Sequence, residues 1–186
     1  SKKKPVLRYG SKINDDIYIT GTISDSYLGL CILKKNKNFG LLNKYFIKKY
    51  YEPNLPVNFS KYLSYFASSS IDISDGIVQD LQHICNQSKL GAFINLNLLT
   101  LSKHCKELVK KNKITLKNIF SKGDDYQILF TANSKYRSKI LRFSRKSKVK
   151  VSRIGQIKKD KNIIFEYNGI NIKLNPKNIG YIHKFK

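Results

Sequence analysis

Short apolar segments that alternate between strand spacing and helix spacing run through the chain and constrain its fold more than any other feature. Residues 16–22 and 68–73 alternate with period two, which is typical of strands, whereas the apolar residues of 77–85 lie on one face of a helix. Strand and helix segments follow one another irregularly. The pattern therefore predicts an α+β fold, layered as α/β/α around a mixed sheet, rather than a regular parallel sheet.

The same spacing predicts the remaining elements. Helices are expected at 26–33, 39–51, 59–66, 102–111, 115–120 and 134–145. Strands are expected at 91–96, 126–131, 149–156, 162–167 and 170–174. Asn168-Gly169 suits a tight hairpin turn between the last two strands, and the chain is expected to end in a meander.

The size and composition of the chain favour one domain with a single sizeable core. It has 186 residues, of which 41% are hydrophobic, and no apolar run approaches the roughly 20 residues that a membrane helix needs. Cys31, Cys85 and Cys105 are odd in number and far apart, so neither a disulfide framework nor a metal-type cysteine pair is expected. These features predict a cytoplasmic protein without a membrane partner.

The net charge of +24 would suit a nucleic-acid partner, but the composition offers another explanation. Lys greatly outnumbers Arg, Asn and Ile are abundant, and Ala is scarce, which is typical of a genome that drifts toward A and T. Most Lys side chains are then expected on solvated faces. We do not expect nucleic acid to bind, although a basic binding module built on the helix at 134–148 remains an alternative.

Carboxylates are scarce in this chain, and four of the twelve acidic residues fall in two short clusters. In the first cluster, Asp72 ends an apolar strand, and Ser74-Asp75-Gly76 forms a turn that leads into a helix. Free backbone N–H groups at a helix start attract anions, and Gly76 permits close approach. Asp72 and Asp75 offer the hard oxygen ligands that Mg²⁺ prefers beside phosphates. The alternative is that Ser74 or Asp75 only caps the helix.

The second cluster is Gly123-Asp124-Asp125-Tyr126, at the start of the strand expected at 126–131. Adjacent carboxylates repel each other unless cations or hydrogen-bond donors meet them. An ordinary Gly-Asp turn is the alternative. The sequence contains no motif of a phosphate-binding loop, a dinucleotide fold, a nucleophile elbow or a zinc protease, and His83 is expected to be a surface histidine.

Several motifs stand in a fixed order around and between the two clusters. In chain order they are Arg8-x-Gly10-Ser11, Asp25-Ser26-x-x-Gly29-Leu30, Asp72-x-Ser74-Asp75-Gly76, Asp80-Leu81, Gly123-Asp124-Asp125-Tyr126, Ile154-Gly155-Gln156 and Gly180-Tyr181-Ile182-His183. Each motif alone is modest, but as an ordered set they resemble the thiamine-monophosphate kinase family. Asp124 stands where that family usually has Glu, and Ile182 where it has Asp, which bears on substrate affinity more than on fold.

The resemblance implies a fold and part of a site. The fold is that of the carboxy-terminal domain of aminoimidazole-ribonucleotide-synthetase-like proteins, which hold ATP and metals across a homodimer. By the family's pattern, Arg8 and Ser74 would contact ATP. Asp72 and Asp75 would be the catalytic residues, because they would bind Mg²⁺.

The resemblance also implies the reaction and its partners. The enzyme would transfer the γ-phosphoryl group of ATP to thiamine monophosphate, which Asp124 and Tyr181 would contact. Residues 1–186 would form a carboxy-terminal kinase domain, with 1–24 leading in from an absent amino-terminal domain that mediates the homodimer. An inactive remnant, or a sister enzyme of the same fold with another substrate, remains an alternative.

Overall fold

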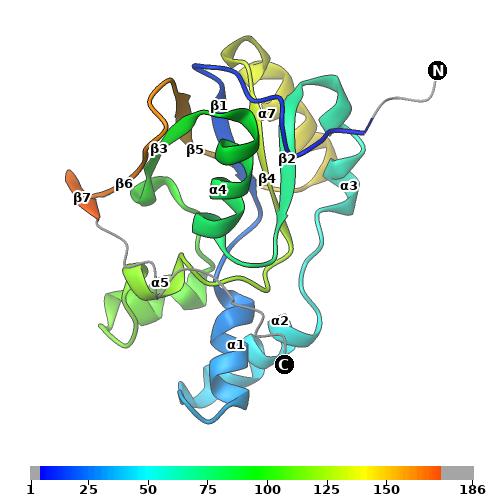
Figure 1. Ribbon diagram of the computed structural model, residues 1–186. Coiled ribbons are helices and arrows are strands. Elements are labelled where there is room, and N and C mark those ends of the chain that lie inside the picture. The colour runs from blue at the N-terminus through cyan, green and yellow to red at the C-terminus, as the bar shows by residue number, and fades with distance from the viewer. Residues whose placement is uncertain (1–4, 173–186) are drawn as a thin grey trace, which may run out of the picture.

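The computed structural model describes residues 5–172, apart from the side chains of 117 and 118. Its centre is one seven-stranded sheet with the strand order β2-β4-β1-β5-β3-β6-β7 (Figure 1). The strands are β1 (Asp16–Thr20), β2 (Ala67–Ile73), β3 (Gly91–Asn95), β4 (Gln127–Ala132), β5 (Val151–Lys158), β6 (Ile163–Tyr167) and β7 (Ile170–Ile172). Neighbouring strands are antiparallel except β3 and β6, which are parallel. The predicted α+β class with a mixed sheet is confirmed.

Helices pack against both faces of the sheet. They are α1 (Asp25–Leu33), α2 (Asn43–Tyr51), α3 (Val57–Ser60), α4 (Ile77–Ser88), α5 (Lys103–Lys110), α6 (Leu116–Ile119) and α7 (Arg137–Ser147). Figure 1 shows α4 over one face and α7 over the other, with α1 and α2 packed together beyond the lower end of the sheet. None of the helices within residues 5–172 is long and apolar enough to cross a membrane.

The strands place alternate side chains into two separate cores, one on each face of the sheet. Ile17 of β1 belongs to the first core together with Leu81 of α4. Its neighbour Tyr18 points into the second core, where its ring stacks on Phe130 at 5.1 Å and Ile140 of α7 packs against the sheet. Two cores on opposite faces confirm the predicted α/β/α layering.

The single helix expected at 59–66 is wrong. The structure has α3, which ends at Ser60, and a separate 3-10 turn at Leu63–Tyr65. Phe59, Leu63 and Phe66 are all buried in the second core. Their spacing of four and three residues suits two short turns as well as one helix, so packing against the sheet decides between them.

The expected closing meander is also wrong, although its hairpin is confirmed. β5 pairs with β1 on one side and β3 on the other, so it has no free edge for β6. β6 instead adds to β3 in parallel, and β7 then pairs with β6. Asn168 and Gly169 have φ values of +51° and +78°, which a tight two-residue hairpin turn requires.

Candidate functional site

The junction between β2 and α4 carries the first carboxylate cluster. Gly76, with a φ of +113°, occupies the N-cap position of α4. Asp80, in the first turns of the same helix, accepts the backbone N–H groups of Asp75 and Gly76 at 3.2 and 3.1 Å. Asp80 therefore holds the turn that leads into α4. The N-cap residue is Gly76 and makes no side-chain capping bond, so the alternative that Ser74 or Asp75 caps the helix is wrong. The Asp75 carboxylate accepts a hydrogen bond from the Gln79 side chain at 3.1 Å.

The second carboxylate cluster packs directly against the first through the backbone. The N–H of Asp124 donates to the Ser74 carbonyl at 3.0 Å, and the N–H of Tyr126 donates to the Ile73 carbonyl at 2.9 Å. A Cβ atom on Gly123 would lie 1.8 Å from the Ser74 carbonyl oxygen, a distance that no side chain tolerates. Gly123 thus permits the close approach of the two loops, which an isolated Gly-Asp turn does not explain.

A cleft of about 360 Å³ opens where these two loops face α1 and α2. It is lined by Leu30, Lys34, Tyr50, Ser74, Asp75, Asp124 and Tyr126. Three of the residues predicted from the sequence, Ser74, Asp75 and Asp124, therefore share one cavity although they come from distant segments. Sequence reasoning missed Lys34 and Tyr50, because nothing in the local pattern of α1 or α2 distinguishes them from other surface residues.

Two further predicted residues lie along the edge of the sheet and do not line the cleft. The side chains of Arg8 and Asp72 are both exposed. The Leu7 carbonyl accepts the N–H of Ser70 at 2.9 Å, so the segment that carries Arg8 runs beside β2, the strand that carries Asp72. Tyr181 lies outside the described residues. The ligand roles of all these residues stay predictions.

One group of side chains beside the cleft has the composition of a metal site. Ligand atoms of Asp75, Asp80 and His83 all lie within 4.8 Å of one another. His83 is half-buried in this group, and its expected role as a surface histidine rather than a ligand stays a prediction. The available signal was the spacing of Asp80 and His83, three residues apart on one helix face. Carboxylate oxygens suit Mg²⁺, whereas a ring nitrogen suits transition metals, so the two carboxylates fit the predicted ion best.

Burial and mutual repulsion raise the pKa of the carboxyl groups around the cleft. Burial and the negative charge of Asp75 together raise the pKa of Asp80 to about 7. Burial also raises the pKa of Asp124; the Lys34 ammonium group acts in the opposite direction, and Asp75 adds to the rise. A cation held among these carboxylates would relieve their repulsion. The electrostatics of the free cleft therefore favour binding of a cation.

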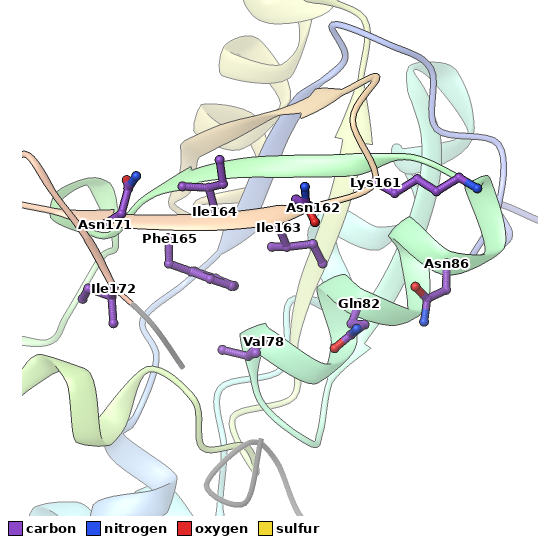
Figure 2. A pocket seen from close by; sticks show the side chains of 10 residues that line it. All are labelled: Val78, Gln82, Asn86, Lys161, Asn162, Ile163, Ile164, Phe165, Asn171 and Ile172. Atoms are coloured by element: carbon purple, nitrogen blue, oxygen red, sulfur yellow. The ribbon is translucent and has the colours of Figure 1, made fainter. Parts of the chain in front are cut away.

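A second groove of about 580 Å³ lies between α4 and the hairpin of β6 and β7 (Figure 2). Val78 and Gln82 of α4 face Phe165 of β6 and Ile172 of β7 across it. The residues that line it carry apolar or amide side chains, apart from Lys161, and none is a carboxylate. This groove is larger than the cleft but holds none of the predicted site residues, so size does not identify the chemical site here.

Comparison with known proteins gives consistent relatives, although no family model matches the sequence. Thiamine-monophosphate kinase of Buchnera aphidicola from Acyrthosiphon pisum is 36% identical over 183 residues, which cover 91% of this chain and 56% of the relative. The enzyme of Escherichia coli K12 is 36% identical over 130 residues, covering 69% of this chain and 40% of the relative. The chain spans about half the length of the curated relatives that it matches.

Solved structures agree with these relatives. The structure of AaThiL complexed with AMPPCP and TMP superimposes with a TM-score of 0.78 and 25% identity, over 96% of this chain and 54% of that one. Escherichia coli HypE, a hydrogenase maturation protein, shares the fold with a TM-score of 0.65 at 11% identity, over 92% of this chain and 52% of that one. The architecture is therefore the aminoimidazole-ribonucleotide-synthetase-like fold, which ThiL, HypE and PurL share. Within that fold class, the chain belongs to the thiamine-monophosphate kinase family.

Proposed function

We propose that this protein transfers the γ-phosphoryl group of ATP to thiamine monophosphate, giving thiamine diphosphate and ADP, and that this chain supplies one part of the site. The observation that supports the proposal best is the meeting of Ser74, Asp75 and Asp124 in a single cleft. These are the residues that the family resemblance assigns to ATP, metal and acceptor. A relative of this fold has been determined with AMPPCP and TMP, which is consistent with the same ligands here.

The reaction needs no nucleophile from the protein. An anionic phosphate oxygen of thiamine monophosphate attacks the γ-phosphorus of ATP, and the bond from that phosphorus to the bridging oxygen of ADP breaks. The barrier lies in bringing two polyanions together in line, so catalysis depends on positioning and on neutralising charge. Bound Mg²⁺ would supply that neutralisation. In this chain Asp75 and Asp72 would hold the metal, with Asp80 beside them.

The walls of the cleft suit the acceptor of this reaction. Asp124 offers a carboxylate to the cationic thiazolium ring of thiamine monophosphate, and Tyr50 and Tyr126 offer aromatic faces that attract a flat cation. Lys34 adds one positive charge at the same cleft, which suits the phosphate end of the acceptor. Tyr181 is proposed to complete this half of the site by contacting the acceptor ring.

The nucleotide would lie on the other side of the first carboxylate cluster. Ser74 would contact ATP from the turn after β2, and Arg8 would reach it from the segment beside the same strand. We further propose that 1–186 is a carboxy-terminal kinase domain, that a preceding domain mediates a homodimer, and that the enzyme works in the cytoplasm. The match covers 56% of each of two curated relatives, and the remaining length of those relatives supports a further domain.

Two substitutions in the full-length protein test the proposed roles separately. Asp75→Asn should lower turnover far more than it lowers the melting temperature, because the lost charge holds a metal. Asp124→Ala should raise the KM for thiamine monophosphate and leave the KM for ATP unchanged. Glu52→Gln, which removes an exposed carboxylate outside the cleft, is the matched control. Near-normal turnover of Asp75→Asn at saturating Mg²⁺ would rule out the metal role.

The choice of acceptor separates the proposal from its alternatives. A coupled assay that measures ADP release with thiamine monophosphate and with other phosphorylated acceptors distinguishes this enzyme from a sister enzyme of the same fold. An inactive remnant would release no ADP with any acceptor, although it would fold.

A further inference from the structure

Asp125 lies beneath the acceptor side of the cleft and takes no direct part in the proposed reaction. Only 3% of its surface is exposed. Its neighbours Asp124 and Tyr126 both line the cleft, and both have left-handed backbones, with φ values of +69° and +51°. Non-glycine residues seldom adopt this conformation unless other contacts hold them in it. The loop thus turns two side chains toward the cleft while the one between them points into the protein.

The carboxyl group of Asp125 binds the start of α1. It accepts the backbone N–H of Ser24 at 2.5 Å and that of Ser26 at 3.3 Å. Ser24 is the N-cap residue of α1, yet its own side chain makes no capping bond to that helix. The Ser24 hydroxyl instead donates to the Ile119 carbonyl at 3.2 Å, which ties α1 a second time to the segment before the loop. Asp125 therefore caps α1 from a segment 101 residues away in the chain.

This bond joins the two walls of the cleft. One wall is the loop that carries Asp124 and Tyr126, and the other is built by α1 and its C-cap residue, which contribute Leu30 and Lys34. Both walls meet at the carboxyl group of Asp125. A small shift of this group would change the distance between the carboxylate of one wall and the ammonium group of the other.

We propose that Asp125 is a positioning residue for the acceptor, holding the loop of Asp124 at a fixed distance from α1. The inference rests on the proposed function, because it concerns binding of thiamine monophosphate in this cleft. Asparagine cannot replace the carboxyl group, since its amide nitrogen would face a backbone N–H and leave it unsatisfied. Glutamate keeps both acceptor oxygens but is one methylene longer, so it would move the walls apart.

The decisive variant is Asp125→Asn in the full-length protein. Its KM for thiamine monophosphate should rise by about tenfold or more, the factor that one unsatisfied buried backbone N–H implies, while its KM for ATP stays within about twofold of the wild type. Asp125→Glu, which keeps the carboxyl group, should fold and show a smaller rise in the same constant. Asp16→Asn is the matched control, because Asp16 is equally buried but binds Arg137 and lines neither wall. It should lower the melting temperature and leave both KM values unchanged.

A double-mutant cycle shows whether Asp125 acts through Asp124. In an Asp124→Ala background, Asp125→Asn should raise the KM for thiamine monophosphate by less than about twofold, since the group that it positions is gone. Equal rises in both KM values, or a full tenfold effect in the Asp124→Ala background, would overturn the positioning role. A wild-type protein that does not phosphorylate thiamine monophosphate would refute the proposed function and this inference with it. Wild-type activity with an unchanged KM in Asp125→Asn would refute the inference alone.

Discussion

Replacing Gly123 with alanine tests whether the two carboxylate loops depend on each other. The added Cβ would lie 1.8 Å from the Ser74 carbonyl oxygen and 2.5 Å from its carbon. Both are backbone atoms, so no side-chain rotation relieves the clash and the loops must separate. Separation breaks the hydrogen bond from Asp124 to Ser74 and the one from Tyr126 to Ile73.

The size of the effect follows from these contacts. Two backbone hydrogen bonds contribute about 1 kcal/mol each, and the steric displacement costs about 1–3 kcal/mol more, so the free energy of unfolding should fall by roughly 3–5 kcal/mol. In a chain of 186 residues each kcal/mol lowers the melting temperature by about 2–4 °C. Gly123→Ala should therefore melt roughly 6–20 °C below the wild type. It should also bind thiamine monophosphate more weakly at temperatures where it stays folded.

Thermal melts followed by circular dichroism, with calorimetric titration of thiamine monophosphate, measure both consequences. Gly40→Ala is the control, because no atom lies within 4 Å of its would-be Cβ; its φ of +61° adds a backbone strain that Gly123, whose φ is not positive, does not have. That variant should lose only about 1–2 kcal/mol from backbone strain and bind the acceptor normally. A Gly123→Ala protein that melts with the wild type and binds the acceptor equally well would refute the claim that the loops need this close approach.

Three further outcomes are expected. Burial raises the pKa of Asp16, but hydrogen bonds from Arg137 and Arg153 outweigh burial, so the net pKa is lowered. The ionised Asp16 carboxylate therefore stabilises the fold above about pH 4, and this stabilisation is lost as the pH falls further. The melting temperatures of Asp16→Asn and the wild type should then converge in acid. Burial raises the pKa of Asp125 to about 8, so its contribution is present below about pH 4 and lost as the pH rises toward 8, and the melting deficit of Asp125→Asn should shrink over that range. Lys139 lies on the basic helix α7, away from the cleft, so Lys139→Ala should leave the KM of both substrates unchanged. If α7 instead serves as a nucleic-acid-binding module, binding of single-stranded RNA should be measurable and should weaken steeply with salt.

Periodicity located most strands and helices because it reports local burial. The helix after Gly76 and the strand that contains Asp72 were predicted from the sequence, and both occur close to the expected residues. The prediction of one helix at 59–66 was wrong because apolar residues three and four apart do not distinguish one helix from two turns. The predicted meander was wrong for another reason. The order of the closing strands depends on which strand edge is already occupied, and no local sequence pattern indicates this.

Some residues of the candidate site could be predicted from the sequence and others could not. Scarce carboxylates beside glycine marked Asp75 and Asp124, and the structure places both in one cleft. The bond from Asp125 to α1 could not be predicted, because it depends on where a backbone N–H of a distant segment lies. Lys34 could not be predicted for a different reason: in a chain so rich in lysine, nothing in the sequence distinguishes this lysine from the others.

The charge of the cleft has the opposite sign to the charge of the chain. The chain carries +24 overall, yet the residues that line the cleft include two carboxylates, Asp75 and Asp124, against one ammonium group, that of Lys34. ATP and a phosphorylated acceptor would bring several more negative charges to this place. Two like unit charges about 4 Å apart repel by roughly 4 kcal/mol at an effective dielectric of 20, so the proposed substrates would need added cations to bind here. Lysines on the outer faces do not meet that need. A divalent metal at Asp75, as proposed, would meet it, which would be a physical reason for acidic residues to persist in so basic a chain.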